Sequence, residues 1–102
     1  MIVYIAAPYS NGDPAQNVHN VLKIADALIE RGHIPFIPHL SYYWHLVSPK
    51  PLSFWHDYDN VFLRMCDCVL RADGKSEGAD KEVELARKLG IPVFYDVCDI
   101  PL

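Results

Sequence analysis

One carboxylate stands out because it interrupts the apolar face of a predicted helix. Residues 79–89 follow helical spacing, and a glycine and a proline just beyond them are typical of a helix end. On a helical wheel, Glu82 falls in the middle of the apolar arc, which is formed by Ala79, Val83, Leu85, Ala86 and Leu89. A carboxylate that faces a core is unfavourable unless something requires it there. Glu82 is therefore a candidate nucleophile or base, and a structural pairing with Arg71 or Lys81 is the alternative.

A second carboxylate could supply a general acid. Asp59 lies in the middle of a helix that we expect to be capped by Ser53. A carboxyl at this position could protonate a leaving group. On periodicity alone a solvated helix surface is the better interpretation of Asp59, and Asp57 is the competing candidate.

Two loops have compositions that suit ligand binding. Ser76 lies between two glycines just before helix 79–89, where free amides and the helix dipole attract anions. The loop matches neither phosphate-binding glycine motif, so an ordinary turn is the alternative. Aromatic side chains that could stack a flat ring, at about 1–3 kcal/mol per base, are Tyr9, Tyr42, Tyr43 and Trp44. A satellite core or a subunit interface would use the same residues.

No spacing of potential ligands indicates a metal, and we predict neither a metal site nor an organic cofactor. The five histidines are scattered along the chain. Cys66 and Cys68 flank an expected buried strand, which disfavours a thiol nucleophile, and strand alternation would place both on one face.

Composition excludes several classes of function. The chain has 102 residues, 51% of them hydrophobic, which suits one domain, residues 1–102, with a proper core. A net charge of -4 without a basic cluster argues against binding duplex nucleic acid. No apolar run is long enough to span a membrane, and the start lacks the pattern of a signal peptide, so we expect a cytoplasmic protein.

The order of the elements predicts an α/β fold. Strands are expected at 1–6, 34–38, 66–70 and 91–95, with helices after Asp13, after Ser53 and at 79–89. Residues 39–51 read as an irregular loop, and 96–102 cannot be placed. This alternation favours a parallel sheet of four to five strands with helices on both faces, of the flavodoxin-like or Rossmann-like kind. Ligands then bind beyond the carboxyl ends of the strands, where loops 7–13, 38–52 and 71–78 meet.

Three segments in this order resemble the nucleoside 2-deoxyribosyltransferase-like superfamily. They are Tyr4-Ile-Ala-Ala-Pro-Tyr-Ser10, Met65-Cys-Asp-Cys-Val-Leu70, and Ser76-x-Gly-Ala-x-x-Glu82 with its continuation to Val93. The resemblance covers nearly the whole chain and looks closest to small phage and bacterial members, related to nucleoside 5′-monophosphate N-glycosidases. Two features depart from the pattern: Glu84 replaces a frequent glycine, and Ser10-Asn-Gly12 replaces the Gly-Gly-Arg phosphate loop of the hydrolases.

The resemblance implies roles for individual residues. Glu82 would be the catalytic carboxylate, Asp59 would act on the leaving base, and Tyr9 would help to place Glu82. Ser76 would contact a phosphate. We also predict substrate binding at Ser10, Gly78, Ala79, Tyr43, Trp44 and Asp67.

The expected activity is cleavage or transfer of an N-glycosidic bond on a nucleoside or nucleoside 5′-monophosphate, through a glycosyl ester on Glu82. A non-catalytic nucleotide-binding or sensor module, an interaction domain that uses the aromatic loop, and an NAD glycohydrolase are the alternatives. We also expect a homodimer or larger homo-oligomer, with Tyr43 or Trp44 at the interface.

Overall fold

Four parallel strands form the sheet in a computed structural model that describes residues 1–102. The strands are β1 (Ile2–Ala6), β2 (Ile34–Phe36), β3 (Cys68–Arg71) and β4 (Val93–Phe94). Their order is β2-β1-β3-β4, and every pairing is parallel. The predicted α/β fold is confirmed, and the proline-containing strand β2 lies at an edge, where a missing backbone donor does least harm.

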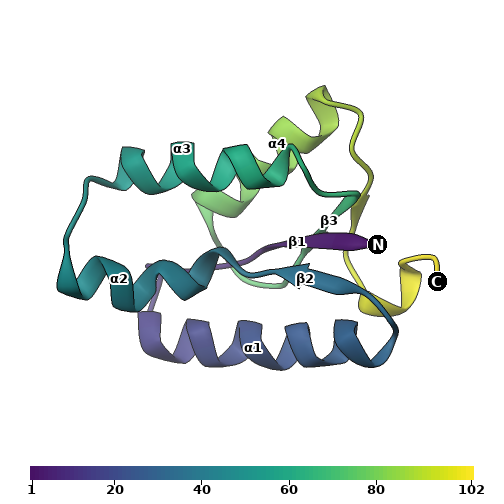
Figure 1. The fold of residues 1–102 in the computed structure, drawn as a ribbon, viewed down its shortest axis with the longest axis horizontal. Coiled ribbons are helices and arrows are strands. Elements are labelled where there is room, and N and C mark those ends of the chain that lie inside the picture. Colours follow the sequence, from purple (N-terminus) through teal and green to yellow (C-terminus); the bar gives the residue numbers. More distant parts are fainter.

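Helices cover both faces of this sheet (Figure 1). Helix α1 (Pro14–Glu30) lies on one face, and its first turn is capped by Asp13, whose Oδ1 accepts the Ala15 amide at 3.0 Å. Helices α3 (Leu52–Leu63) and α4 (Glu77–Lys88) lie on the other face. A short helix, α2 (Ser41–Val47), follows β2 at the carboxyl end of the sheet. No helix combines the length and the apolar character that crossing a bilayer would need.

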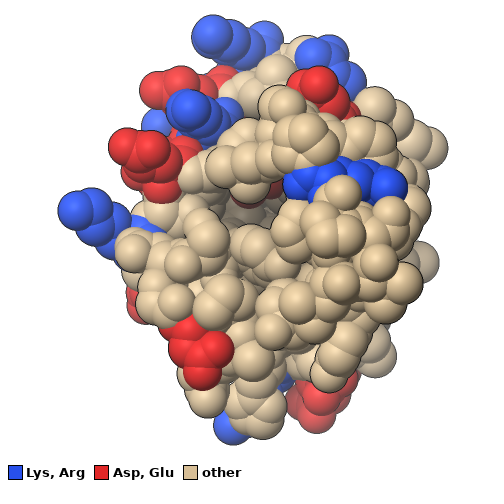
Figure 2. All heavy atoms as spheres, turned by 90° about the vertical axis from the view of Figure 1, so that its left-hand side faces the viewer, with Lys and Arg blue, Asp and Glu red and all other residues tan.

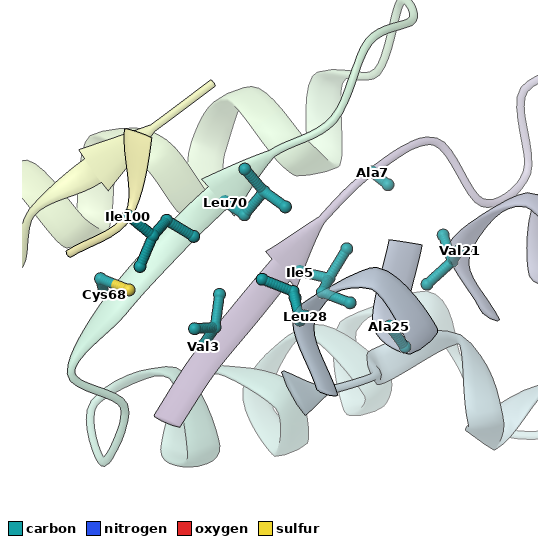
Figure 3. Packing of buried hydrophobic residues seen from close by; sticks show 9 residues of the cluster. All are labelled: Val3, Ile5, Ala7, Val21, Ala25, Leu28, Cys68, Leu70 and Ile100. Atoms are coloured by element: carbon teal, nitrogen blue, oxygen red, sulfur yellow. The ribbon is translucent and has the colours of Figure 1, made fainter. Parts of the chain in front are cut away.

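The alternation of side chains along β1 divides the core in two. Val3 and Ile5 point to α1, where they join the buried cluster shown in Figure 3. Tyr4 and Ala6 point the other way, towards α3 and α4. The second face is therefore the one on which β1 can meet Glu82.

Three details of the predicted elements are wrong. The stretch 39–51 is not irregular: a 3₁₀ turn, Pro38–Leu40, runs directly into α2. Seven residues are too few for a helical period to be recognised, and aromatic residues lower helix propensity. Tertiary contacts instead hold the helix, since the Trp44 ring lies 5.1 Å from that of Trp55 and 5.7 Å from that of Tyr58.

The other two corrections concern the residues at which predicted elements begin. Helix α3 starts at Leu52 after Pro51, and Ser53 does not cap it. Cys66 ends the turn after α3, with its amide bonded to the Leu63 carbonyl, so Cys66 and Cys68 enter different clusters of the core. The tail that could not be placed forms a 3₁₀ turn, Val97–Asp99, and buries Ile100 against the α1 face.

Candidate active site

Helix α4 brings Glu82 to the sheet. Ser76 caps the helix, because its Oγ accepts the Ala79 amide at 3.1 Å. The buried stripe of α4 is Ala79, Val83 and Ala86, and Glu82 lies beside it, largely buried. Its Oε2 accepts a hydrogen bond from the hydroxyl of Tyr4. The inward orientation indicated by the helical wheel is thus present, and Glu82 forms no ion pair with Arg71 or Lys81.

Tyr4 was missed as a site residue. It lies in an apolar run, so the sequence predicts an ordinary aromatic residue of the core, and Tyr4 is indeed fully buried. The one available signal is its hydroxyl, since a buried tyrosine usually has a hydrogen-bond partner. Tyr9, expected to place Glu82, packs instead on His39 and Tyr42 with ring centroids at 5.6 and 6.2 Å. The contact expected of Tyr9 is made by Tyr4 because strand alternation points Tyr4 at α4.

Asp59 approaches the same place from α3. Burial raises the pKa of its carboxyl from 3.8 to about 7. Burial also raises the pKa of Glu82 from 4.5 to about 7. The hydrogen bond from Tyr4 opposes this increase, and so does the charge of Arg71, whereas the nearby charge of Asp59 adds to it. Burial and the Glu82 charge raise the pKa of Tyr4, which stays protonated. Asp57, the competing candidate, is exposed.

Two hollows of different character adjoin these carboxylates. A cleft of about 320 Å³ includes Asp59 and Ser41, and its other lining side chains are apolar or aromatic, namely Pro35, Phe36, Ile37, Pro38, Leu40, Trp44 and Tyr58. A smaller pocket of about 80 Å³ includes Glu82 and is lined only by polar residues and a glycine, namely His56, Asn60, Gly78 and Lys81. Figure 2 looks onto the carboxyl end of the sheet, where mostly uncharged side chains surround a central hollow.

Aromatic rings connect the large cleft to Glu82. Phe36 stacks between Phe62 and Tyr4, with ring centroids at 4.8 and 5.5 Å. Tyr58 continues the series at 5.1 Å from Phe62. Phe36 and Tyr58 line the cleft that includes Asp59, and Tyr4 contacts Glu82, so this series of rings borders both carboxyl groups, whose pKa values are raised by burial. Sequence reasoning placed neither Phe36 nor Tyr58 at the site.

The loops at this end of the sheet are tied together. Asn11 donates from its side chain to the Lys75 carbonyl at 2.7 Å. Gly74 has a φ of +117°, and a Cβ there would lie 2.7 Å from Cγ of Pro8, so only glycine fits. The loop after β1 and the loop after β3 therefore form one wall beside the N-terminus of α4.

The remaining predicted binding residues are scattered. Trp44 lines the large cleft and Gly78 the small pocket, whereas Tyr43 is 73% exposed. Ser10 is exposed on the loop after β1. Ala79 belongs to the buried core of α4. Asp67 is not at the cleft: it precedes β3 at the amino end of the sheet, where it accepts the Ile2 amide at 2.7 Å.

The arrangement offers acid–base and nucleophilic chemistry. A buried carboxylate held by a hydroxyl and a second carboxyl with a raised pKa are the parts needed for a double displacement. No group of three or more His, Cys, Asp or Glu side chains is arranged to hold a metal ion.

Comparison with known proteins relates the chain to one enzyme by fold and to one family by sequence. A solved structure of 2-deoxyribosyltransferase from the psychrotolerant bacterium Bacillus psychrosaccharolyticus aligns with a TM-score of 0.64 and 20% identity, over 91% of this chain and 69% of that one. This likeness shows a common fold. No curated protein matches the sequence. The family model for a domain of unknown function, DUF7768, matches residues 1–96, and the chain therefore belongs to the DUF7768 family.

Proposed function

We propose that the protein is an enzyme that cleaves or transfers the N-glycosidic bond of a nucleoside or a nucleoside 5′-monophosphate. The observation that carries this proposal is the pair Glu82 and Asp59, which adjoins an aromatic cleft on one side and a polar pocket on the other. A nucleoside has the same division into a flat base and a polar sugar. The fold shared with a 2-deoxyribosyltransferase supports this reading.

In the first step Glu82 attacks C1′ of the sugar. Tyr4 holds Oε2, which leaves Oε1 as the attacking oxygen. The bond from C1′ to the base nitrogen breaks, and its electron pair stays on the base, which takes the proton of Asp59. The products are a glycosyl ester on Glu82, a neutral base and an Asp59 carboxylate.

In the second step the ester is resolved. Asp59 accepts a proton from water or from a second base, and the oxygen or nitrogen of that molecule attacks C1′. The bond to Glu82 breaks and returns the carboxylate. Two inversions give net retention at C1′. Water makes the enzyme a hydrolase, and a second base makes it a transferase.

The raised pKa values suit the roles of Glu82 as nucleophile and Asp59 as acid near neutral pH. The reactive form carries one proton on the pair, with Glu82 ionised and Asp59 protonated. Tyr4 and Arg71 favour the ionised form of Glu82, whereas Asp59 is influenced chiefly by burial. Because the two groups interact, apparent pKa values describe the pair rather than either residue.

A substrate panel tests the proposal. The protein is incubated with nucleosides, their 5′-monophosphates and NAD, and released base is measured by chromatography, with Glu82→Gln as the inactive control. Release that depends on Glu82 supports the proposal, and addition of a second base separates transfer from hydrolysis. Release from NAD alone would assign an NAD glycohydrolase. Binding without release at high protein concentration would assign a sensor module and refute catalysis.

A further inference from the structure

One aromatic wall of the large cleft belongs to a helix that is too short to hold its own position. Trp44 lines the cleft from α2, and this helix has seven residues, none of them buried. Helices shorter than about 12 residues are marginal on their own in water, so contacts with neighbouring elements decide where they lie. The position of Trp44 therefore depends on the side chains that fix α2 to the rest of the molecule.

His45, the residue after Trp44, fixes α2 through a single nitrogen atom. Its Nδ1 accepts the indole Nε1–H of Trp55 at 2.8 Å and the backbone N–H of Lys50 at 3.3 Å. Trp55 lies in α3, whereas Lys50 lies in the short connection between the two helices. One imidazole ring therefore joins α2, the connection and α3.

The two hydrogen bonds define the protonation state of this ring. An indole N–H and a backbone N–H can only donate, so Nδ1 of His45 presents its lone pair to both. The ring is then neutral, and its proton lies on Nε2. A replacement side chain keeps both hydrogen bonds only if it has an acceptor at the position of Nδ1. Asn has such an acceptor, because its Oδ1 is bonded to Cγ as Nδ1 is in His, and Leu does not.

Loss of the acceptor would leave a buried donor without a partner. Trp55 is 7% exposed, and its indole N–H makes no hydrogen bond other than the one to His45. Water can replace this acceptor only if Trp55 or α2 moves. Either movement displaces Trp44, because the two indole rings are in edge-to-face contact with centroids 5.1 Å apart. His45 thus acts on the cleft through Trp55.

The hydrogen bond to the connection keeps a cation beside the same ring. The Nζ of Lys50 lies 5.8 Å from the ring centroid of Trp44 and 5.3 Å from that of Phe54. An ammonium group at this distance is attracted to an indole and favours one orientation of the ring. Because the backbone of Lys50 is bonded to His45, the imidazole also supports this contact.

We propose that His45 is a positioning residue for base binding: in its neutral form it holds Trp44 in place as the wall on which the base stacks. This step rests on the proposed function, in which the large cleft receives the base. His45 itself does not line the cleft. Its replacement should therefore weaken the affinity for the base and leave bond cleavage by Glu82 and Asp59 unchanged.

Paired substitutions at position 45 test this role by kinetics on a nucleoside that the substrate panel shows to be cleaved. His45→Leu removes the acceptor and should raise KM by about tenfold, as expected for loss of part of one base–aromatic stacking interaction, with kcat within about twofold of the wild type. His45→Asn keeps the acceptor and should raise KM by less than about threefold. His19→Leu makes the first change on an exposed position of α1 and should alter neither constant.

Two measurements without turnover make the result independent of catalysis. Adenine and thymine are titrated while the fluorescence of the two tryptophans is followed, because a base that stacks on Trp44 changes its emission. We expect the wild type and His45→Asn to bind at least one of these bases, and His45→Leu to bind it about tenfold more weakly. In ¹H–¹⁵N spectra, the indole N–H of Trp55 should exchange faster with water in His45→Leu than in the wild type or His45→Asn.

The outcomes separate this proposal from the proposed function. An unchanged base affinity in His45→Leu, an equal loss in His45→Leu and His45→Asn, or a loss confined to kcat would overturn the role of His45. Absence of binding of both bases to the wild type would overturn it as well. Base binding with the expected dependence on position 45, but without cleavage of any nucleoside, would refute the proposed function and support the role of His45.

Discussion

Replacing Glu82 with glutamine should stabilise the fold at alkaline pH while it removes activity. The ionised carboxylate is held largely buried against Tyr4, and burial raises its pKa from 4.5 to about 7. Each tenfold change in proton affinity is worth about 1.4 kcal/mol, so this difference corresponds to roughly 3 kcal/mol. Glutamine has nearly the same shape and still offers Tyr4 an acceptor, so the variant keeps the hydrogen bond without the buried charge.

The sign of the pH dependence follows from linkage. Between pH 4.5 and 7 the folded wild type binds more protons at Glu82 than the unfolded chain, so its stability falls as the pH rises through this range. The glutamine variant lacks this loss. Its free energy of unfolding should exceed that of the wild type by less than about 1 kcal/mol at pH 5 and by about 2–3 kcal/mol at pH 8. The difference at pH 8 corresponds to roughly 10 °C in Tm for a domain of this size.

Urea and thermal unfolding at the two pH values measure this advantage. Glu84→Gln is the matched control, because Glu84 is exposed on the same helix and should change stability by less than about 0.5 kcal/mol at either pH. A Glu82→Gln variant that is less stable than the wild type at pH 8, or equally stabilised at pH 5 and 8, would refute the reasoning that Glu82 is a buried charge.

Three further predictions concern the site and its surroundings. Tyr4→Phe should raise the pKa of Glu82, move the acid limb of kcat/KM to higher pH and lower kcat by about tenfold or more; an unchanged pH profile would contradict this role. The wild-type profile should be bell-shaped with a maximum near pH 7, since only the singly protonated pair reacts, and Asp59→Asn should remove the alkaline limb; a profile that rises steadily with pH would exclude Asp59 as the acid. Two copies should associate through α2, because residues 32–49 carry no charged Asp, Glu, Lys or Arg in a chain of net charge -4. Tyr43→Glu should then give a monomer in analytical ultracentrifugation at about 10 µM, and a wild type that is monomeric at about 100 µM would be contrary evidence.

The order of elements and the orientation of Glu82 were accessible from the sequence because both follow from periodicity. A continuous apolar run predicts β1, and the helical wheel places Glu82 on the inner face of α4. Asp59 could be proposed but not chosen over Asp57 from the pattern, because its raised pKa depends on the burial created by packing of α3.

The missing parts of the site depend on contacts between distant segments. Tyr4 contacts Glu82, which lies 78 positions away in the sequence. Because Tyr4 is part of an apolar run, the sequence gives no indication that its hydroxyl belongs to a site. Helix α2 is held by the ring of Trp44 against α3 rather than by any helical pattern of its own. Asp67 lay in a recognisable motif, yet β3 begins just after it, which places its carboxylate at the opposite end of the sheet.

The most direct test of the central claim is a search for the glycosyl ester on Glu82. The protein is incubated with a 2′-fluoro-2′-deoxynucleoside, because the fluorine destabilises positive charge at C1′ and slows hydrolysis of the ester. Intact mass and peptide mapping then locate any adduct. We predict a gain of one fluorinated glycosyl group on the peptide that contains Glu82, and none in Glu82→Gln. Base release without an adduct, or an adduct on another residue, would contradict the account.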